Sequence, residues 1–388
     1  MTDLVVVQHE TYYNCFTMNI NYTLFRRRIF AWYAKHSRLL PWRNTGTTID
    51  PYRVWVSEIM LQQTTTKTVE GYFDRFVKRF PTIAELAAAS IDEVNRYWEG
   101  LGYYRRCVQM HRAAQEIVTR FGGVFPNRRE DVLSLPGIGR YTAGAILSIA
   151  FDQQQPILEA NTIRLHARLL ALRADPTQKA ANALLWNFAE KILPRKNTGR
   201  FNQALMDLGN LICTIQEPQC LQCPVVQFCE TAKLGLQSEI PFQKTKEKIE
   251  YRTEVALLVR KQGKILLVRY PEGVRWAGLW DFPRAETNAE QPNHIVTDPK
   301  LRERLMLMTG RRLEPEILLE TIKHSVTRFR ITLFFFKGID HGKISLLENT
   351  ENTKPYELRW VTPAELAHIP LNSTGRKLVH NINQETIW

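Results

Sequence analysis

The sequence predicts a two-domain chain, with a mainly helical domain first and an α+β domain after it. From about residue 21 to residue 230, apolar residues recur at three- and four-residue spacing, which is typical of amphipathic helices. The segment 242–252, FQKTKEKIEYR, is charged and has no apolar stripe, so we interpret it as an interdomain linker. Beyond it, short apolar runs follow one another as strands do.

Successive segments carry the helical pattern, and helix start and stop signals such as Pro51, Pro81 and Gly122 separate them. The segments are TLFRRRIFAWYAKH, YRVWVSEIMLQQTTTKTVEGYFDRF, TIAELAAA, IDEVNRYWEGL, RRCVQMHRAAQEIVTRFG, REDVLSL and TAGAILSIAF. They predict a helical domain over 21–241. Residues 1–20 lack such a pattern and are interpreted as an N-terminal extension.

In the second domain, 253–388, the runs EVALLVR and KILLVRY are predicted strands, and the KQG between them is a hairpin signal. FRITLFFFKG is a third predicted strand. YELRWVTPAELAHI is typical of a strand followed by a helix that begins with proline.

The composition favours a soluble globular protein that binds a polyanion. Of the 388 residues, 44% are hydrophobic and 23% are charged, and no apolar run approaches the roughly 18 residues of a membrane span. The N-terminus lacks the basic and then apolar stretches of a secretory signal. The net charge of +13 indicates nucleic acid as the partner, with mere solubility or a membrane surface as the alternatives.

Four of the six cysteines, Cys213, Cys220, Cys223 and Cys229, lie in one short segment. Secreted disulfide-rich proteins spread their cysteines more widely, so the spacing indicates a metal site in a reducing compartment. Thiolates select iron–sulfur clusters or zinc. Zinc sites favour two short C-x(2–4)-C pairs, and only one is present here, so the spacing favours an iron–sulfur cluster and leaves zinc as an alternative.

The segment LPGIGRYTAGA, 135–145, predicts a glycine turn that leads into a helix. Gly137 and Gly139 can adopt backbone conformations that other residues avoid, which leaves amides free at the start of the helix near Tyr141. Such a helix start binds anions, including the phosphates of DNA. The alternative is a plain helix–turn–helix without a ligand.

These motifs resemble those of the MutY family of helix–hairpin–helix base-excision DNA glycosylases, which remove adenine opposite 8-oxoguanine. The resemblance rests on LPGIGRYTAGA, the cysteine spacing, LPWR (40–43), VWVSEIMLQQT (54–64), GLGYYRR (100–106) and FNQALMDLG (201–209), and it covers about 21–388. It implies a six-helix barrel over about 45–155 and a module with a 4Fe–4S cluster from 21–44 and 156–241. It also implies a MutT-like (Nudix-like) C-terminal domain.

Hydrolysis of an N-glycosidic bond needs an acid for the leaving base and a negative group near the cationic sugar. Glu58 is isolated in an apolar, amide-rich helix, so we expect its pKa to be raised; the alternative is a surface glutamate. By resemblance, Glu58 protonates adenine and later handles water. The second family carboxylate belongs to a D-G-N motif, where this chain has Glu159-Ala160-Asn161. We expect Glu159 to stabilise the oxocarbenium ion, with Asn161 beside it; either could instead cap the following helix.

Tyr141 separates two reaction types. In relatives that resemble endonuclease III, this position holds a lysine that attacks the sugar and nicks the strand. Tyrosine cannot form that imine, but it can donate a hydrogen bond to the second carboxylate or to the sugar intermediate. Tyr141 therefore favours base removal without strand cleavage, unless it only fills the core.

The resemblance also assigns DNA contacts. It implies that Gln63 and Tyr103 wedge into the base stack, although Tyr103 could be plain core. It places Trp42, Arg43 and Gln203 around the adenine, because glutamine can pair with that base. The stretch between Arg43 and the catalytic helix is slightly longer than is usual in the family.

The C-terminal domain is predicted to read a lesion and not to hydrolyse nucleotides. EGVRWAGLWDFPRAE, 272–286, resembles the MutT-like core of the family. A Nudix hydrolase needs several glutamates on one helix to hold magnesium, and DPKLRERLMLMTG offers only Glu303. Where the family has a Phe-Ser-His triplet, this chain has Val326, Thr327 and Arg328, so Thr327 keeps a hydroxyl but the aromatic wedge is absent.

The sequence thus predicts a monofunctional adenine DNA glycosylase. Its expected substrate is double-stranded DNA with adenine opposite 8-oxoguanine or guanine. We expect a monomer without membrane association, cytoplasmic and associated with the nucleoid, of bacterial type. The alternatives are a bifunctional glycosylase/lyase that resembles endonuclease III, a thymine-mismatch glycosylase, and a non-catalytic iron–sulfur protein that binds lesions.

Overall fold

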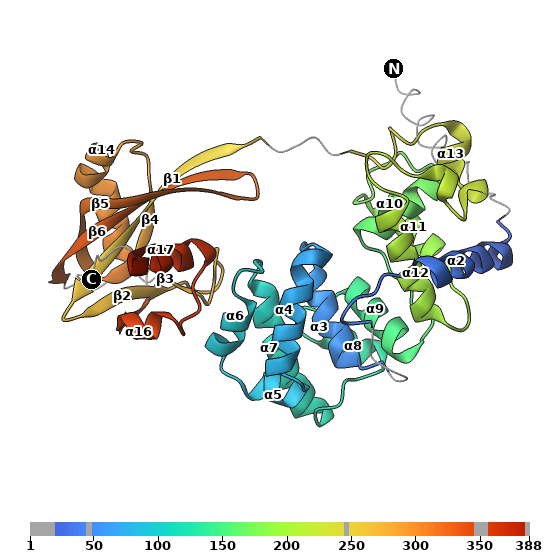
Figure 1. The fold of residues 1–388 in the computed structure, drawn as a ribbon, viewed down its shortest axis with the longest axis horizontal. Helices are drawn as coiled ribbons and strands as arrows, with labels where there is room; N and C mark the ends of the chain where they lie inside the picture. The colour runs from blue at the N-terminus through green and yellow to red at the C-terminus, as the bar shows by residue number, and fades with distance from the viewer. Residues whose placement is uncertain (1–19, 44–48, 244–247, 345–355, 385–388) are drawn as a thin grey trace, which may run out of the picture. The chain divides into compact units, whose positions relative to one another are not determined.

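The computed structural model describes residues 20–43, 49–243, 248–344 and 356–384 (Figure 1). The chain divides into two compact units, one formed by 1–78 with 113–245 and the other by 79–112 with 246–388. The first unit is helical and the second carries a mixed sheet, so the predicted fold class is confirmed.

Helices build the first unit, coloured blue to yellow-green in Figure 1. In chain order they are α2 (Tyr22–His36), α3 (Pro51–Leu61), α4 (Thr66–Arg79), α7 (Arg105–Phe121), α8 (Arg129–Ser134), α9 (Arg140–Phe151), α10 (Ala160–Leu169), α11 (Lys179–Lys191), α12 (Thr198–Leu211), the one-turn η1 (Cys220–Gln222) and η2 (Val226–Phe228), and α13 (Glu230–Leu234). The last residue of α4 and the first turns of α7 belong to the second unit. None of the helices in the described residues is both long and apolar enough to cross a membrane.

The helix α9 lies deep in the first unit because its residues are small. It packs against α3 and α12, and Thr142 through Ile149 are all buried. A Cβ added to Gly144 would lie 2.3 Å from the carbonyl oxygen of Pro156, a separation that real side chains do not reach. A second core forms where α2, α10, α11 and α12 meet. Helices from distant parts of the chain are thereby fixed around α9.

The second unit combines two short helices, α5 (Ile83–Ala88) and α6 (Ile91–Trp98), with a seven-stranded sheet and the helices that cover it. Its strands are β1 (Glu250–Lys261), β2 (Lys264–Arg269), β3 (Trp280–Asp281), β4 (Arg284–Thr287), β5 (Arg311–Val326), β6 (Phe329–Lys343) and β7 (Glu357–Val361). Its remaining helices are α14 (Pro292–Thr297), α15 (Pro299–Thr309), α16 (Pro363–Leu366) and α17 (Ser373–Gln384). The strand order is β3-β2-β1-β6-β5, with β4 on β1 and β7 on β2; β1 and β6 run parallel and the other pairs are antiparallel.

Side chains of alternate residues in β1 point to opposite faces of this sheet, as strand geometry requires. Ala256 and Leu258 pack with Leu378 of α17 on one face. Val255 and Leu257 pack with residues of α15 on the other. Both faces are covered, which explains why EVALLVR is apolar without interruption.

The structure corrects two details of the sequence prediction. The strand β1 begins at Glu250, so residues 250–252 belong to the sheet and not to the predicted linker. The long strand β5 was not predicted, because its side chains are mostly half-buried or exposed, it contains Pro315, and its register against β6 shifts three times. Thr327 and Arg328 therefore form a two-residue turn between β5 and β6.

Candidate active site

Glu58 is a buried acid in the middle of α3. Asp50 caps the start of this helix by accepting a hydrogen bond from the Tyr52 amide, and Pro51 occupies the first turn. Residues 54–60 are all buried, and Glu58 itself is 5% exposed. Burial raises the pKa of Glu58 to about 7, which agrees with the sequence expectation.

Tyr141 holds the Glu58 carboxyl from the first turn of α9. Gly137 has a φ of 77°, and Gly139 is the N-cap, so the chain turns sharply into α9. The Tyr141 hydroxyl donates a hydrogen bond to Glu58 Oε2 at 2.5 Å. Burial, followed by the nearby negative charges of Glu58 and Glu159, raises the pKa of Tyr141 well above its usual value, so this hydroxyl stays a donor.

In this structure Tyr141 donates to Glu58 and not to the second carboxylate, Glu159; a hydrogen bond to the sugar intermediate stays a prediction. Because α9 packs directly on α3, a side chain in its first turn reaches Glu58. Glu159 meanwhile points its oxygens at its own helix. The hydrogen bond from Tyr141 stabilises the ionised form of Glu58 and partly opposes the effect of burial on its pKa.

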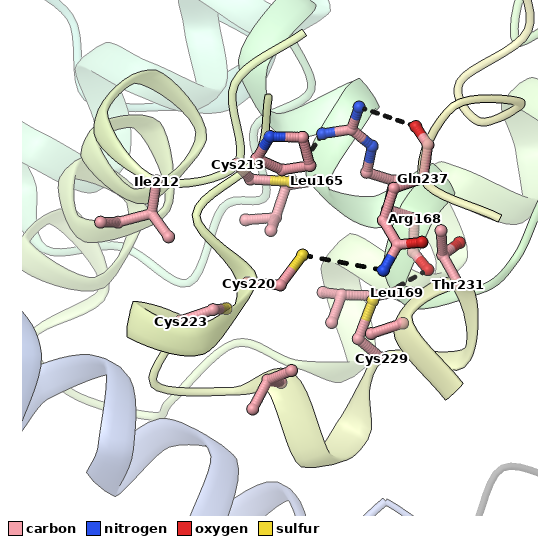
Figure 2. Close-up of a pocket in the computed structure, with 13 residues that line it drawn as sticks. Leu165, Arg168, Leu169, Ile212, Cys213, Cys220, Cys223, Cys229, Thr231 and Gln237 are labelled. Carbon is pink, nitrogen blue, oxygen red and sulfur yellow. Dashed lines mark hydrogen bonds between the residues drawn. The ribbon is translucent and has the colours of Figure 1, made fainter. Parts of the chain in front are cut away.

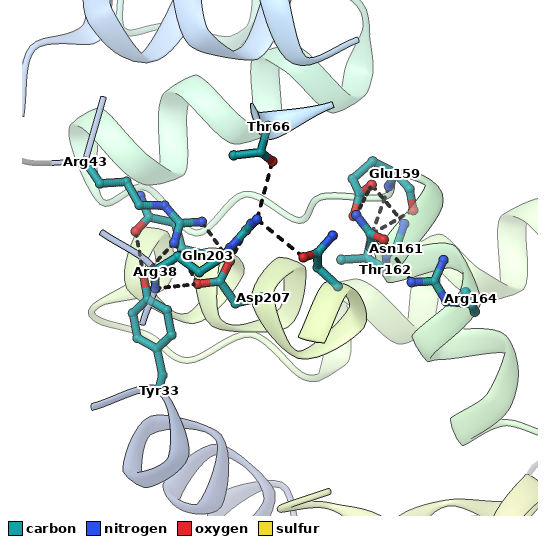
Figure 3. A network of polar contacts seen from close by, with 11 residues as sticks. Tyr33, Arg38, Arg43, Thr66, Glu159, Asn161, Thr162, Arg164, Gln203 and Asp207 are labelled. Atoms are coloured by element: carbon teal, nitrogen blue, oxygen red, sulfur yellow. Dashed lines mark hydrogen bonds and ion pairs between the residues drawn. The ribbon is translucent and has the colours of Figure 1, made fainter. Parts of the chain in front are cut away.

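Glu159 caps α10, as its alternative interpretation proposed. It accepts from the Asn161 amide at 2.8 Å and from the Thr162 amide at 3.0 Å, and the Thr162 hydroxyl accepts from the Glu159 amide to complete a capping box. The Asn161 side chain also donates to Glu159 and accepts from Arg164 (Figure 3). Burial raises the pKa of Glu159. The negative charge of Glu159 in turn raises the pKa of Glu58, so the two carboxyl groups interact electrostatically.

Arg43 belongs to a buried ion-pair network (Figure 3). Its guanidinium makes a bidentate pair with Asp207 of α12, at 2.7 and 3.1 Å. Asp207 is fully buried and also accepts from Arg38 at 2.7 Å. Gln203, one turn earlier on α12, accepts a hydrogen bond from the Tyr33 hydroxyl at 3.0 Å. The positive charge of Arg43 lowers the pKa of Glu58, so the network lies near the acid.

Trp42, Gln63 and Tyr103 differ in how far the structure supports their expected roles. Trp42 is 6% exposed and packs edge-on against Phe73, which places its ring in the core. Gln63 is exposed with a φ of 57°. In the second unit, Tyr103 is 47% exposed with a φ of 49°, so the plain-core alternative for Tyr103 is wrong. Exposed side chains on strained backbone are typical of ligand contacts.

Thr327 occupies the turn between β5 and β6 with a φ of 50°. Its hydroxyl donates to the carbonyl of Val326 at 2.7 Å, which restrains the turn. In α15, the predicted helix is present, and its single acid, Glu303, is exposed. That helix therefore lacks the set of glutamates that would hold magnesium in a hydrolase.

The four clustered cysteines line one pocket of the first unit (Figure 2). The other lining residues are Leu165, Arg168, Leu169, Ile212, Pro218, Val226, Thr231, Ala232 and Gln237. Burial raises the pKa of the Cys223 thiol to about 12 and that of Cys229 to about 11. Within the described residues, no three histidine, cysteine or acidic side chains are arranged to hold a single metal ion.

Nitrogen donors approach two of these sulfurs. Arg168 donates to Cys213 Sγ at 3.4 Å, and Gln237 approaches Cys220 Sγ at 3.9 Å. Arg168 also donates to the backbone carbonyls of Thr214 and Ile215, which ties the cysteine loop to α10. Soft donors on one loop, with N–H groups directed at the sulfurs, suit an iron–sulfur cluster.

Comparisons with known proteins identify the family of this chain. Residues 56–191 match the model of the HhH-GPD superfamily of base excision DNA repair proteins, and residues 254–381 match that of the NUDIX domain. The chain is 32% identical to the adenine DNA glycosylase of Mus musculus over 94% of this chain and 79% of that protein. The chain belongs to the adenine DNA glycosylase family. The adenine DNA glycosylase of Buchnera aphidicola subsp. Schizaphis graminum is 39% identical over 82% of this chain and 91% of its own length.

A solved thermostable thymine-DNA glycosylase is similar in structure to part of this chain. The TM-score is 0.50 at 26% identity, over 55% of this chain and 97% of that one. The similarity extends to a glycosylase named for another base, so it supports the fold and leaves the base to be argued from the site.

The sequence did not identify Tyr33, Arg38 and Asp207 as residues of the site. Their partners lie 164 to 170 residues away, so no local spacing joins them. One signal was available: Asp207 is the only charged residue in FNQALMDLG, as Glu58 is the only acid in its own helix. A lone acid on an apolar helix face needs a buried cationic partner.

Proposed function

We propose that the protein is a monofunctional DNA glycosylase that hydrolyses the N-glycosidic bond of adenine mispaired with 8-oxoguanine or guanine. The proposal rests on one observation: Glu58 is buried on α3, has a pKa of about 7 and accepts a hydrogen bond from Tyr141. A carboxyl with this pKa is about half protonated at neutral pH, which is what a general acid requires.

In this mechanism the acid proton of Glu58 passes to a ring nitrogen of the adenine. Tyr141 donates to Oε2, so Oε1 is the oxygen that carries the proton to the base. As the proton leaves, the carboxylate that forms already has a hydrogen-bond donor in place. The same carboxylate then accepts a proton from the water that attacks the sugar.

Glu159 would stabilise the cationic sugar, since its charge already acts on the neighbouring acid. Tyr141 has no amine and cannot form an imine with the sugar, so the strand stays intact. These two residues favour base hydrolysis over the lyase reaction of enzymes that resemble endonuclease III.

The duplex would be held without regard to sequence by the helix–hairpin–helix. The amides at the start of α9, freed by the turn at Gly137 and Gly139, suit a phosphate, and the net charge of +13 favours the polyanion. Gln63 in the first unit and Tyr103 in the second are each exposed on strained backbone, and each residue by itself suits insertion into a base stack. We place Thr327 in the recognition of 8-oxoguanine by the second domain.

We further propose that the four cysteines hold a 4Fe–4S cluster in a cytoplasmic protein. The cluster would cross-link the loop that follows α12 and hold it in place. Iron and sulfide analysis with the visible spectrum tests this assignment: a brown protein with iron and sulfide supports it, and a colourless one with stoichiometric zinc contradicts it.

Release of free adenine tests the substrate assignment. Duplexes with one adenine opposite 8-oxoguanine, guanine or thymine are incubated with excess protein, and the free base is measured by chromatography. We expect adenine from the first two duplexes only, and a loss of about 10² to 10⁴-fold in Glu58→Gln.

Three results of this assay would contradict the proposal. Tight binding of the mispair without adenine release would indicate a lesion-binding protein. Release of thymine from a thymine:guanine duplex, incubated in parallel as a fourth substrate, would indicate a different base. Equal rates opposite 8-oxoguanine and thymine would exclude reading of the lesion.

A further inference from the structure

Asp207, Arg43, Tyr33 and Gln203 form a chain of hydrogen bonds in which each link has a fixed direction (Figure 3). We propose that this chain fixes the orientation of the Gln203 amide, so that its NH₂ group is presented to the extruded base and selects adenine over bases that carry N–H at the matching ring position. The inference rests on the proposed function and adds Asp207 and Tyr33 as positioning residues.

The chain begins at Asp207, whose carboxylate is fully buried. Both of its oxygens accept from Arg43, and Arg38 adds a further bond to Oδ1. Burial alone would lower the pKa of Arg43, but the hydrogen bonds and charge of Asp207 outweigh it, so the net pKa is raised. Arg43 is therefore a charged and geometrically fixed donor.

Tyr33 is the next residue in the chain, and the directions of its two hydrogen bonds are also fixed. A guanidinium has only N–H donors, so the Tyr33 oxygen must accept from Arg43 Nη1, at 3.5 Å. Burial raises the pKa of Tyr33, which keeps its proton on the oxygen. That proton points to Gln203, 3.0 Å away, and the atom that receives it must be the carbonyl oxygen Oε1.

An isolated glutamine amide can rotate so that its oxygen and nitrogen exchange places. Here, exchange would turn the NH₂ group toward a hydroxyl that already accepts from Arg43, and it would leave the Tyr33 proton without an acceptor. The chain thus assigns one end of the Gln203 amide as oxygen and the other as nitrogen.

The nitrogen end is available to a ligand. Gln203 is partly exposed, whereas its neighbours Asn202 and Ala204 are buried, and within the described part of the chain no acceptor binds its Nε2. The charge of Arg43 acts on Glu58, so the chain lies near the proposed acid.

A fixed amide discriminates between adenine and hypoxanthine. Adenine has an acceptor at N1 beside a donor at its exocyclic amine, whereas hypoxanthine has a donor at N1 beside a carbonyl acceptor. The fixed Nε2 donor, with the free lone pair of Oε1, complements the first pattern and repels the second. An amide that was free to turn would fit either base.

Single-turnover excision of adenine and of hypoxanthine, each opposite 8-oxoguanine, tests the inference. In Tyr33→Phe we expect the ratio of adenine rate to hypoxanthine rate to fall about fivefold, the value of one neutral hydrogen bond. Asp207→Asn, which keeps the shape of the side chain and removes the charge that holds Arg43, should lower the ratio in the same direction. Tyr22→Phe, on the same helix and outside the chain, is the matched control and should keep the wild-type ratio.

The outcomes separate the inference from the function on which it rests. If the wild-type protein releases no adenine, the proposed function is wrong. If it releases adenine and Tyr33→Phe slows both bases equally, the ratio is unchanged and the positioning role is wrong. If Asp207→Asn fails to fold, the result for Tyr33→Phe decides alone.

Discussion

Replacement of Glu58 by glutamine should change how the stability of the helical unit depends on pH. The pKa of Glu58 is about 7 in the folded protein, against an ordinary value of 4.5. Each pKa unit corresponds to about 1.4 kcal/mol, so the neutral form is favoured in the folded state by about 3 kcal/mol. Because the folded pKa is raised, this stabilisation is fully present below pH 4.5 and is lost as the pH rises through 7.

Glutamine keeps the volume and cannot ionise, so Glu58→Gln escapes that loss. We expect its free energy of unfolding, relative to the wild type, to rise by about 3 kcal/mol between pH 4 and pH 8. Urea unfolding followed by circular dichroism at 222 nm, at a series of pH values, measures the difference. Glu130→Gln, at an exposed position of α8, is the control and should differ from the wild type by no more than about 0.5 kcal/mol throughout. A difference for Glu58→Gln that stays flat within about 1 kcal/mol would refute the burial of an ionisable acid at this site.

Two further predictions concern Tyr141 and the packing of α12. Tyr141→Phe removes the hydrogen bond that lowers the pKa of Glu58, so the pH above which the excision rate falls should be higher than in the wild type. An unchanged pH profile would show that this hydrogen bond does not control the protonation of Glu58. Gly209→Ala should destabilise the protein by about 1 to 3 kcal/mol in thermal unfolding, because its Cβ would lie 2.8 Å from Asn161 Cβ and 2.9 Å from the Asn161 carbonyl oxygen. Gly71→Ala, with open space around it on α4, should instead be neutral or stabilising, and equal losses at both sites would contradict this explanation.

Local features of the sequence predicted the acid, and the packing of helices decided its partners. Glu58 could be identified because a single acid stood in an apolar helix, and its raised pKa follows from that burial. Tyr141 could be placed at a helix start, but its hydrogen bond to Glu58 depends on how closely α9 approaches α3. The small residues of α9 permit that approach, and no spacing rule converts them into a contact between residues 83 positions apart.

The same limit explains Glu159 and the buried ion pairs. The capping interpretation of Glu159 was available from sequence, since caps are local, and the structure contains it. Its electrostatic effect on Glu58 is not local. Asp207 and Arg43 meet only after α12 folds beside the chain that follows α2. In the second unit, β5 was missed because partial burial and Pro315 hide its alternation.

We propose that a buried acid held by a tyrosine removes adenine and leaves the strand whole. Single-turnover treatment of a duplex with one adenine opposite 8-oxoguanine, followed by electrophoresis with and without hot alkali, tests both halves of this reaction at once. We predict strand breaks at the adenine only after alkali, because base loss leaves an intact abasic strand. Breaks without alkali would contradict the role assigned to Tyr141, and no breaks under either condition would contradict catalysis by Glu58.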